Sequence, residues 1–339
     1  MNDCDVKKVI SLFHGDAPVS YETKTVRDAE NDKRFVIFVT ANDKKYVIKL
    51  ACNTFTFPER INGAAWLTEE YLKLGCYSPR YLKSLGGYYA ETVILDGVTF
   101  YAWEEEFAKY SFPDSFLGGD DVYAFFAKVG ALGLKGDFGV SGYARLVPFA
   151  LDEKTDEVSA CVDSFDSVVK EKAPEFAPRW DKIFSVWKEN KEKLSEIYER
   201  LPRSVFQADW NRYNVLVDEN GDFVGLVDYN ICGEDTTLNM AISMGLFGYA
   251  SLHGDENGEI FADDEENVRK TLSVFARNYC FSDEEIKAAP ILFKYVNSIY
   301  YSEYEELCDN ICNDEKLREL FDSIEMKLTK EVDFSKSMK

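Results

Sequence analysis

Three polar residues in the middle of the chain have types and spacing suited to phosphoryl transfer. Asp209 is followed five residues later by Asn214, and Asp228 comes after two short apolar stretches. In phosphoryl transfer, one aspartate orients the attacking hydroxyl and accepts its proton, while an asparagine and a second aspartate hold Mg²⁺ against the ATP phosphates. The alternative interpretation is a surface hairpin in which Asp and Asn only form turns.

The stretch between Asn214 and Asp228 predicts a hairpin that brings these two residues together. Residues 215–217 and 223–227 are apolar and indicate two short strands, and Asn220-Gly221 between them favours a tight turn. Because a hairpin returns the chain beside itself, Asn214 and Asp228 are expected at the same end. Two oxygen ligands there suit Mg²⁺, which completes its shell with water and phosphate.

At these residues the chain resembles the aminoglycoside phosphotransferase and choline kinase-like family, within the protein-kinase-like fold. That family's motif reads His-x-Asp-x-x-x-x-Asn, then an apolar hairpin and an Asp; Asp209, Asn214 and Asp228 match it. Two positions depart from the pattern: Gln207 replaces the usual His, and Asn239 replaces a structural Asp. Both changes are expected to alter the hydrogen bonds that brace the catalytic loop.

The resemblance implies an ATP-dependent phosphotransferase that moves the γ-phosphate to a hydroxyl of a small molecule, with ATP and Mg²⁺ as cofactors. A cationic amino alcohol or an aminoglycoside-like compound is the expected acceptor. The alternative is a kinase-like nucleotide-binding protein with little or no transfer activity, which Gln207 and Asn239 motivate.

The N-terminal third predicts a three-stranded antiparallel meander over residues 19–26, 34–40 and 45–50, where β-branched residues are frequent. Lys49 lies on the third strand, where a kinase-like fold needs a cation for the α- and β-phosphates. The alternative is a lysine that simply faces solvent.

A helix is expected after this meander, over residues 59–74, with helical apolar spacing and Gly75 at its end. The fold requires a glutamate on that helix to hold the lysine. The candidates are Glu59, Glu69 and Glu70, and Glu59 is preferred because the other two lie near the end of the helix. Glu59 could instead only complement the helix dipole in the first turn.

Two further strands are expected at residues 87–95 and 98–103, followed by an interlobe hinge at residues 104–108. Backbone groups of Glu105 and Phe107 are expected to bind the adenine edge there. No glycine-rich phosphate loop is present, because residues 28–33 occupy that place without a glycine.

The rest of the chain is mostly helical in pattern, in segments spread over residues 121–330. A sheet region followed by a helical region predicts an α+β, bilobal protein-kinase-like fold with a small antiparallel-sheet N-lobe and a larger helical C-lobe. The expected division is residues 1–107 for nucleotide binding and residues 108–339 for the catalytic loop and the acceptor site.

Composition limits the partners. The 339 residues carry a net charge of −22, which argues against nucleic acid and would attract cationic acceptors. A cation could be bound by the acidic clusters at 255–256, 263–266 and 303–306 and by the tyrosines of Tyr300-Tyr301-x-x-Tyr304. The alternative is that the clusters only make the surface polar and that the tyrosines only pack.

The chain shows no membrane span, no signal-peptide pattern and no paired cysteine motif, so we expect a cytoplasmic protein. The sequence leaves the oligomeric state open.

Overall fold

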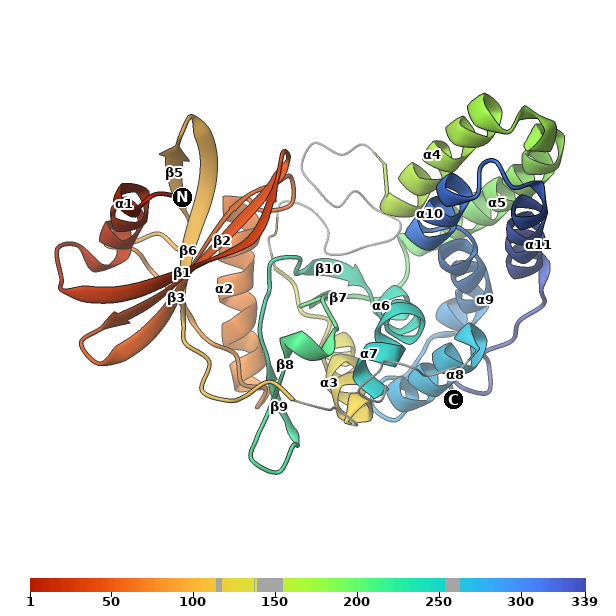
Figure 1. Cartoon of the computed structure of the whole chain (residues 1–339). Helices are drawn as coiled ribbons and strands as arrows, with labels where there is room; N and C mark the ends of the chain where they lie inside the picture. Colours follow the sequence, from red (N-terminus) through yellow and green to blue (C-terminus); the bar gives the residue numbers. More distant parts are fainter. Residues whose placement is uncertain (114–117, 137, 139–154, 254–262) are drawn as a thin grey trace.

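The computed structural model describes residues 1–113, 118–136, 138, 155–253 and 263–339. An antiparallel-sheet lobe at the N-terminal end is joined to a larger, mainly helical lobe that holds the C-terminus (Figure 1). This arrangement confirms the predicted α+β bilobal fold.

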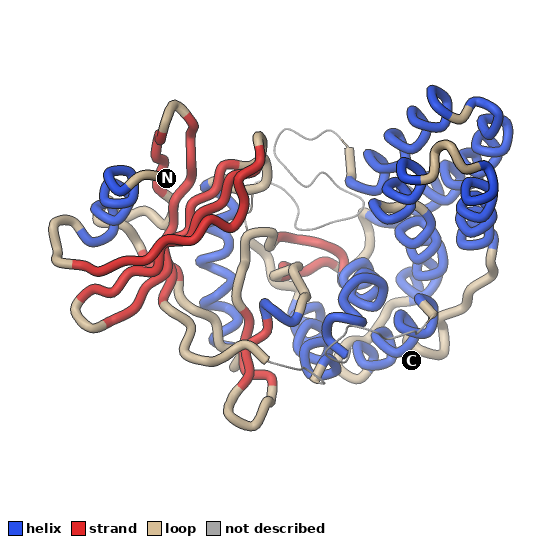
Figure 2. The backbone as a smooth tube through the Cα atoms, in the orientation of Figure 1, coloured by secondary structure: helices blue, strands red, loops and turns tan. Residues whose placement is uncertain are grey.

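The N-lobe sheet contains the predicted meander of β1 (Val19–Ala29), β2 (Asp32–Ala41) and β3 (Lys44–Cys52). It continues through β6 (Val98–Glu106) to β4 (Tyr81–Leu82), and β5 (Glu91–Leu95) also pairs with β6. Asn42 and Asp43 make the β2–β3 turn with positive φ angles of 50° and 61°, which these two residue types tolerate. The strands are shown in red in Figure 2.

Helices cover both faces of this sheet. Helix α1 (Asp3–His14) buries Val6, Val9, Ile10 and Phe13 against one face, in a core shared with Ile48 and Leu50 of β3. Because strand side chains alternate, Lys49 between them points to the opposite face. On that side α2 (Pro58–Lys73) packs in the main core of the molecule together with Ala51 and Trp103.

The helical lobe contains two short antiparallel pairs, β7 (Arg203–Phe206) with β10 (Gly233–Thr236) and β8 (Val215–Val217) with β9 (Phe223–Leu226). Short helical turns lie at η1 (Pro174–Phe176), η2 (Arg212–Asn214) and the π-helical turn η3 (Met244–Gly248). The α-helices are α3 (Gly119–Leu132), α4 (Glu157–Lys172), α5 (Ala177–Tyr198), α6 (Thr237–Ser243), α7 (Tyr249–His253), α8 (Asp264–Ala276), α9 (Asp283–Ser298), α10 (Tyr301–Asp309) and α11 (Asp314–Thr329).

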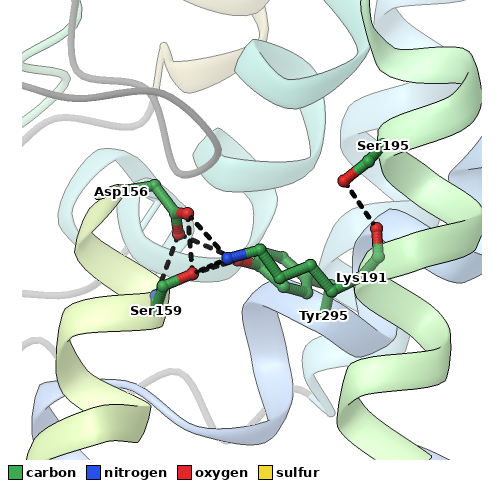
Figure 3. A network of polar contacts seen from close by, with 5 residues as sticks. All are labelled: Asp156, Ser159, Lys191, Ser195 and Tyr295. Carbon is green, nitrogen blue, oxygen red and sulfur yellow. Dashed lines mark hydrogen bonds and ion pairs between the residues drawn. The ribbon is translucent and has the colours of Figure 1, made fainter. Parts of the chain in front are cut away.

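A polar network fastens α4 to α5 and α9 (Figure 3). Asp156 caps α4 by accepting from the Ser159 N–H at 2.9 Å, and it also accepts from the Ser159 hydroxyl at 2.7 Å and the Tyr295 hydroxyl at 2.8 Å. Lys191 on α5 lies 3.4 Å from the same carboxylate. The Asp156 carboxylate is therefore saturated by protein groups, as a buried ion requires.

No helix in the described part of the chain is long and apolar enough to cross a membrane. Within the described residues the eight cysteines form no disulfide. The acidic cluster at residues 255–256 lies outside the described residues.

Candidate active site

The loop predicted to be catalytic follows β7 and is braced by Gln207. The Gln207 side-chain amide donates to the carbonyls of Val227 at 2.9 Å and Asp228 at 2.8 Å, and its oxygen accepts from the Asp209 N–H at 2.9 Å. Ala208 and Asp228 both have positive φ, 68° and 59°, a conformation that non-glycine residues keep only when their surroundings enforce it. Gln207 thus ties the loop to the end of the hairpin, so a brace remains at the position where the family has His.

Asp209 is oriented by two amides. Asn211 donates to its carboxylate at 2.6 Å, and the Asn214 side chain donates to its backbone carbonyl at 3.1 Å. Burial and the nearby charge of Asp228 raise the pKa of Asp209, although the amides of Asn211 and Asn214 partly oppose that change. A raised pKa makes the carboxylate a better proton acceptor.

The predicted hairpin does bring Asn214 and Asp228 to one end. The Val227 N–H donates to the Asn214 carbonyl at 2.9 Å. Asp228, the residue after Val227, is therefore held at the same end of the hairpin as Asn214. Gly225 on β9 lets the hairpin dock closely, since a Cβ there would lie 2.1 Å from the Tyr77 carbonyl. The Asp228 carboxylate and the Asn214 amide oxygen are hard oxygen donors, so this pair fits Mg²⁺.

Lys49 completes the group from the other lobe. Its Nζ lies 3.3 Å from Asp228 and 3.1 Å from Glu105. Burial alone would lower the pKa of Lys49, but the charges of Asp228 and then Glu105 more than offset it and raise that pKa. The ammonium group therefore stays charged, and the alternative of a solvent-facing lysine does not hold.

The prediction that Glu59 holds Lys49 is wrong. Glu59 is exposed in the first turn of α2 and lines a separate surface pocket with Asn62, Trp66 and Lys135. The buried face of α2 begins with the next residue, Arg60, so Glu59 lies outside the packed stripe. The glutamate that holds the lysine is Glu105, on the neighbouring strand β6.

The adenine-binding role predicted for the Glu105 backbone is also wrong. Glu105 pairs with Val47 on one side and Tyr81 on the other, so its backbone lies inside the sheet. Its side chain accepts from Trp103 Nε1 at 2.8 Å as well as from Lys49. The strand runs further than its apolar pattern indicated, because Glu105 has a cationic partner on the cleft face.

Phe107 follows directly after β6. Its N–H donates to the Lys45 carbonyl at 3.3 Å, so that group is not available to adenine. Its ring is exposed and packs edge-on against Phe38, with 6.4 Å between ring centres. A contact between the Phe107 backbone carbonyl and the adenine edge stays a prediction.

The substitution at Asn239 has a local effect away from the catalytic loop. Asn239 donates to Asp235 at 2.6 Å, and Tyr198 donates to the same carboxylate at 2.6 Å. Burial raises the pKa of Asp235 to about 6, although these two donors oppose that change. Asn239 therefore braces Asp235, while Gln207 braces the catalytic loop.

Sequence reasoning missed several side chains that lie beside Lys49 and Asp228. They line one pocket with those two residues and comprise Arg34, Asn53, Thr56 and Asn230. Strand alternation gave a signal for Arg34, which stands two residues before Val36, the register partner of Lys49.

Solved structures with the same architecture are small-molecule kinases. An amicoumacin kinase in complex with AMP-PNP and Ca²⁺ aligns with a TM-score of 0.59 at 12% identity, covering 99% of this chain and 97% of that one. A microcompartment-associated aminopropanol kinase aligns with a TM-score of 0.52 at 11% identity, covering 96% of this chain and 95% of that one. The ADP-bound aminoglycoside phosphotransferase APH(2'')-Ib gives the same TM-score and identity, over 96% of this chain and 99% of that one.

No protein-family model matches this sequence, and no curated protein sequence matches it. The structural similarity nevertheless places the chain in the protein-kinase-like fold, in the form seen in these small-molecule kinases. The fold that the motif predicted is thereby confirmed.

Proposed function

We propose that the protein is an ATP-dependent phosphotransferase that moves the γ-phosphate of ATP to a hydroxyl of a small cationic alcohol. The observation that carries this proposal is a continuous set of contacts in a kinase fold. Asn214 contacts Asp209 and pairs with the end of the hairpin, and Asp228 at that end contacts Lys49. Base, metal ligands and phosphate cation are thus adjacent, as phosphoryl transfer requires.

Each residue has a defined task in this reaction. Lys49 binds the α- and β-phosphates, and Asn214 with Asp228 would hold Mg²⁺. When bound, Mg²⁺ supplies positive charge that stabilises the phosphate oxygens during transfer. Asp209 orients the acceptor hydroxyl in line with the γ-phosphate and takes its proton late.

The acceptor side of the proposal is supported by charge. The net charge of −22 favours a cationic substrate. In the helical lobe, the hydroxyls of Tyr300 and Tyr301 donate to Glu157 at 3.0 and 3.5 Å, and Phe247 lies 5.3 Å from the Tyr300 ring. The Tyr300 ring is buried, but the rings of Tyr301 and Phe247 are exposed, and a carboxylate beside such rings suits an ammonium group.

The test has two stages. A thermal shift with Mg·ATP measures nucleotide binding, and ADP release against a panel of amino alcohols and aminoglycosides measures transfer. We expect a clear stabilisation by Mg·ATP and turnover with at least one cationic alcohol. Binding without turnover on any acceptor would favour the nucleotide-binding alternative, and the absence of any shift would contradict both functions.

A further inference from the structure

The pocket beside Lys49 contains a buried hydroxyl that the roles above do not use. Thr56 lines this pocket and is only 4% exposed, yet its Oγ1 has no hydrogen-bond partner among the described residues. Asn230 Oδ1 in the same wall is also buried and without a partner in the described part of the chain. Because buried polar atoms in native proteins are nearly always satisfied, these two groups point to a ligand.

Arg34 supplies a cation on the same wall. It lies opposite Ala51 in the β2–β3 ladder, so it is a diagonal neighbour of Lys49 on the same face. Its Nε and Nη2 each donate to Asp32 at 2.7 Å, and its guanidinium lies 4.8 Å from the centre of the Phe55 ring. Its Nη1 makes no hydrogen bond within the described residues, so one donor edge of an already oriented guanidinium remains available.

Arg34 shares its carboxylate partner with a second cation. Asp32 also contacts Arg27 at 3.1 Å and accepts from Asn53 at 3.1 Å, so two guanidinium groups share one carboxylate. Burial would raise the pKa of Asp32, but the hydrogen bonds from Arg34 and Asn53 outweigh it and lower that pKa, so Asp32 stays ionised.

The position of Arg34 in the cleft agrees with a role at the transferred group. Arg34 lines one pocket together with Lys49 and Asp228. These two residues are the ones proposed to bind the nucleotide phosphates and Mg²⁺, so a bound nucleotide would place its phosphates beside this pocket wall.

The β1–β2 turn explains why a side chain is needed here. Residues 28–33 contain no glycine, so the chain lacks the turn whose backbone N–H groups usually surround phosphates. We propose that Arg34 and Thr56 bind the terminal phosphate of the nucleoside triphosphate in place of that turn. This inference rests on the proposed function, which supplies the nucleotide. Thr56 stands just before Phe57, the N-cap of α2, so the positive end of that helix lies on the same side.

The test is calorimetric binding of ATP, AMP and inorganic tripolyphosphate, each with Mg²⁺, to the wild-type protein and to three variants. Arg34→Ala should weaken ATP and tripolyphosphate about ten- to hundredfold, the range for a hydrogen bond to a charged group, and leave AMP unchanged. Arg27→Ala is the matched control, because Arg27 shares Asp32 but does not line the pocket; it should bind all three ligands as the wild type does.

Thr56→Val separates a ligand contact from a structural one. The hydroxyl has no partner among the described residues, so its removal should leave the melting temperature of the free protein unchanged or raise it. ATP affinity should nevertheless fall about fivefold to tenfold, the lower part of the range for such a bond. Equal ATP affinities of the wild type and the Thr56→Val variant would remove Thr56 from the proposal.

The remaining outcomes distinguish this inference from the proposed function. If Arg34→Ala keeps its fold by circular dichroism and binds ATP as tightly as the wild type, the phosphate role of Arg34 is wrong and the proposed function stands. If the wild type binds tripolyphosphate and ATP through Arg34 but transfers phosphate to no acceptor, the phosphate site stands and the proposed function fails. A wild-type protein that binds neither ligand overturns both.

Discussion

Two lysine–aspartate pairs with nearly equal separations have opposite surroundings. Lys49 lies 3.3 Å from Asp228 in the cleft, and Lys191 lies 3.4 Å from Asp156 in the helical lobe. The Asp156 side chain is 6% exposed and receives further hydrogen bonds from Ser159 and Tyr295. The Asp228 side chain is 35% exposed, and Lys49 is its only side-chain donor among the described residues.

The difference separates a group that holds the fold from a group available for chemistry. A saturated buried carboxylate has no capacity for another ligand, whereas a half-exposed one at a positive-φ residue can still bind a cation. The distance within an ion pair does not reveal its role, but the number of other donors to the carboxylate does.

The sharpest test of this comparison is Asp228→Asn. Loss of the carboxylate removes the charged oxygen ligand expected for Mg²⁺, so the affinity for Mg·ATP should fall about hundredfold or more, equivalent to several kcal/mol of charge stabilisation. The free energy of unfolding should change by less than about 1 kcal/mol, since the group is half-exposed. Calorimetric titration and urea unfolding measure the two quantities, and an unchanged nucleotide affinity would contradict the metal role.

Asp209→Asn should separate phosphate transfer from nucleotide binding in the cleft. The amide cannot accept the proton of the acceptor hydroxyl, so kcat should fall about 10²- to 10⁴-fold, the usual contribution of a general base. Affinity for Mg·ATP should remain close to that of the wild type. Steady-state kinetics with an active acceptor checks the first result, and transfer at the wild-type rate would show that Asp209 is not the base.

Asp156→Ala should have the opposite profile. It removes the cap of α4 and leaves Lys191 and Tyr295 without their carboxylate, so the free energy of unfolding should fall by about 2–4 kcal/mol. Mg·ATP affinity of the folded protein should not change. Urea unfolding and calorimetry are the measurements, and a selective loss of nucleotide binding without loss of stability would break the distinction drawn here.

The smallest expected effect is a pH dependence of the free energy of unfolding, which arises from Asp235. Its pKa of about 6 in the folded protein is above the value of 3.8 for the free group, so the folded state binds more protons between pH 4 and 6. The stabilising contribution is thus fully present below pH 4 and is lost as pH rises through 6, by at most about 3 kcal/mol. The Asp235→Asn variant should lack this decline, so its unfolding free energy relative to wild type should rise over that window; parallel pH curves would rule out this titration.

The positions of the proposed catalytic and metal-binding residues were predictable because they follow from local patterns. The apolar stretches around Asn220-Gly221 determine the hairpin, and the hairpin determines that Asn214 meets the end carrying Asp228. Lys49 was predictable because three consecutive strands can hardly pair other than as a meander. In both cases the residues that determine the hairpin or the meander lie within a few positions of the polar residues that these elements position.

The partner of Lys49 was not predictable in the same way. Glu59 lies on α2 and Glu105 lies on β6, and both elements pack near Lys49. Which of the two glutamates reaches the lysine depends on how α2 rotates against the sheet. That rotation is decided by burial of Arg60, Ile61 and the alanines that follow, over contacts distant in sequence. The extent of β6 was misjudged for a similar reason, because its last acidic residues pair with strands β3 and β4.

Helix α1 was missed although it left a local signal. Asn2 and Asp5 form a reciprocal capping box, and Val6, Val9, Ile10 and Phe13 have helical spacing. Arg34 was missed because strand alternation assigns it to the face of Lys49 only once the register of β2 against β3 is known.

Helix α1 has a practical consequence for anyone who prepares this protein. His14 at its end lies 2.6 Å from Glu104, and Glu105, the next residue on the same strand, holds Lys49 from the opposite face. A chain shortened by its first fourteen residues would expose the apolar surface around Ile37, Ile48 and Leu50 and leave Glu104 without its partner. Such a shortened protein should aggregate and lose nucleotide affinity together, so the N-terminal helix belongs in every preparation used to study the cleft.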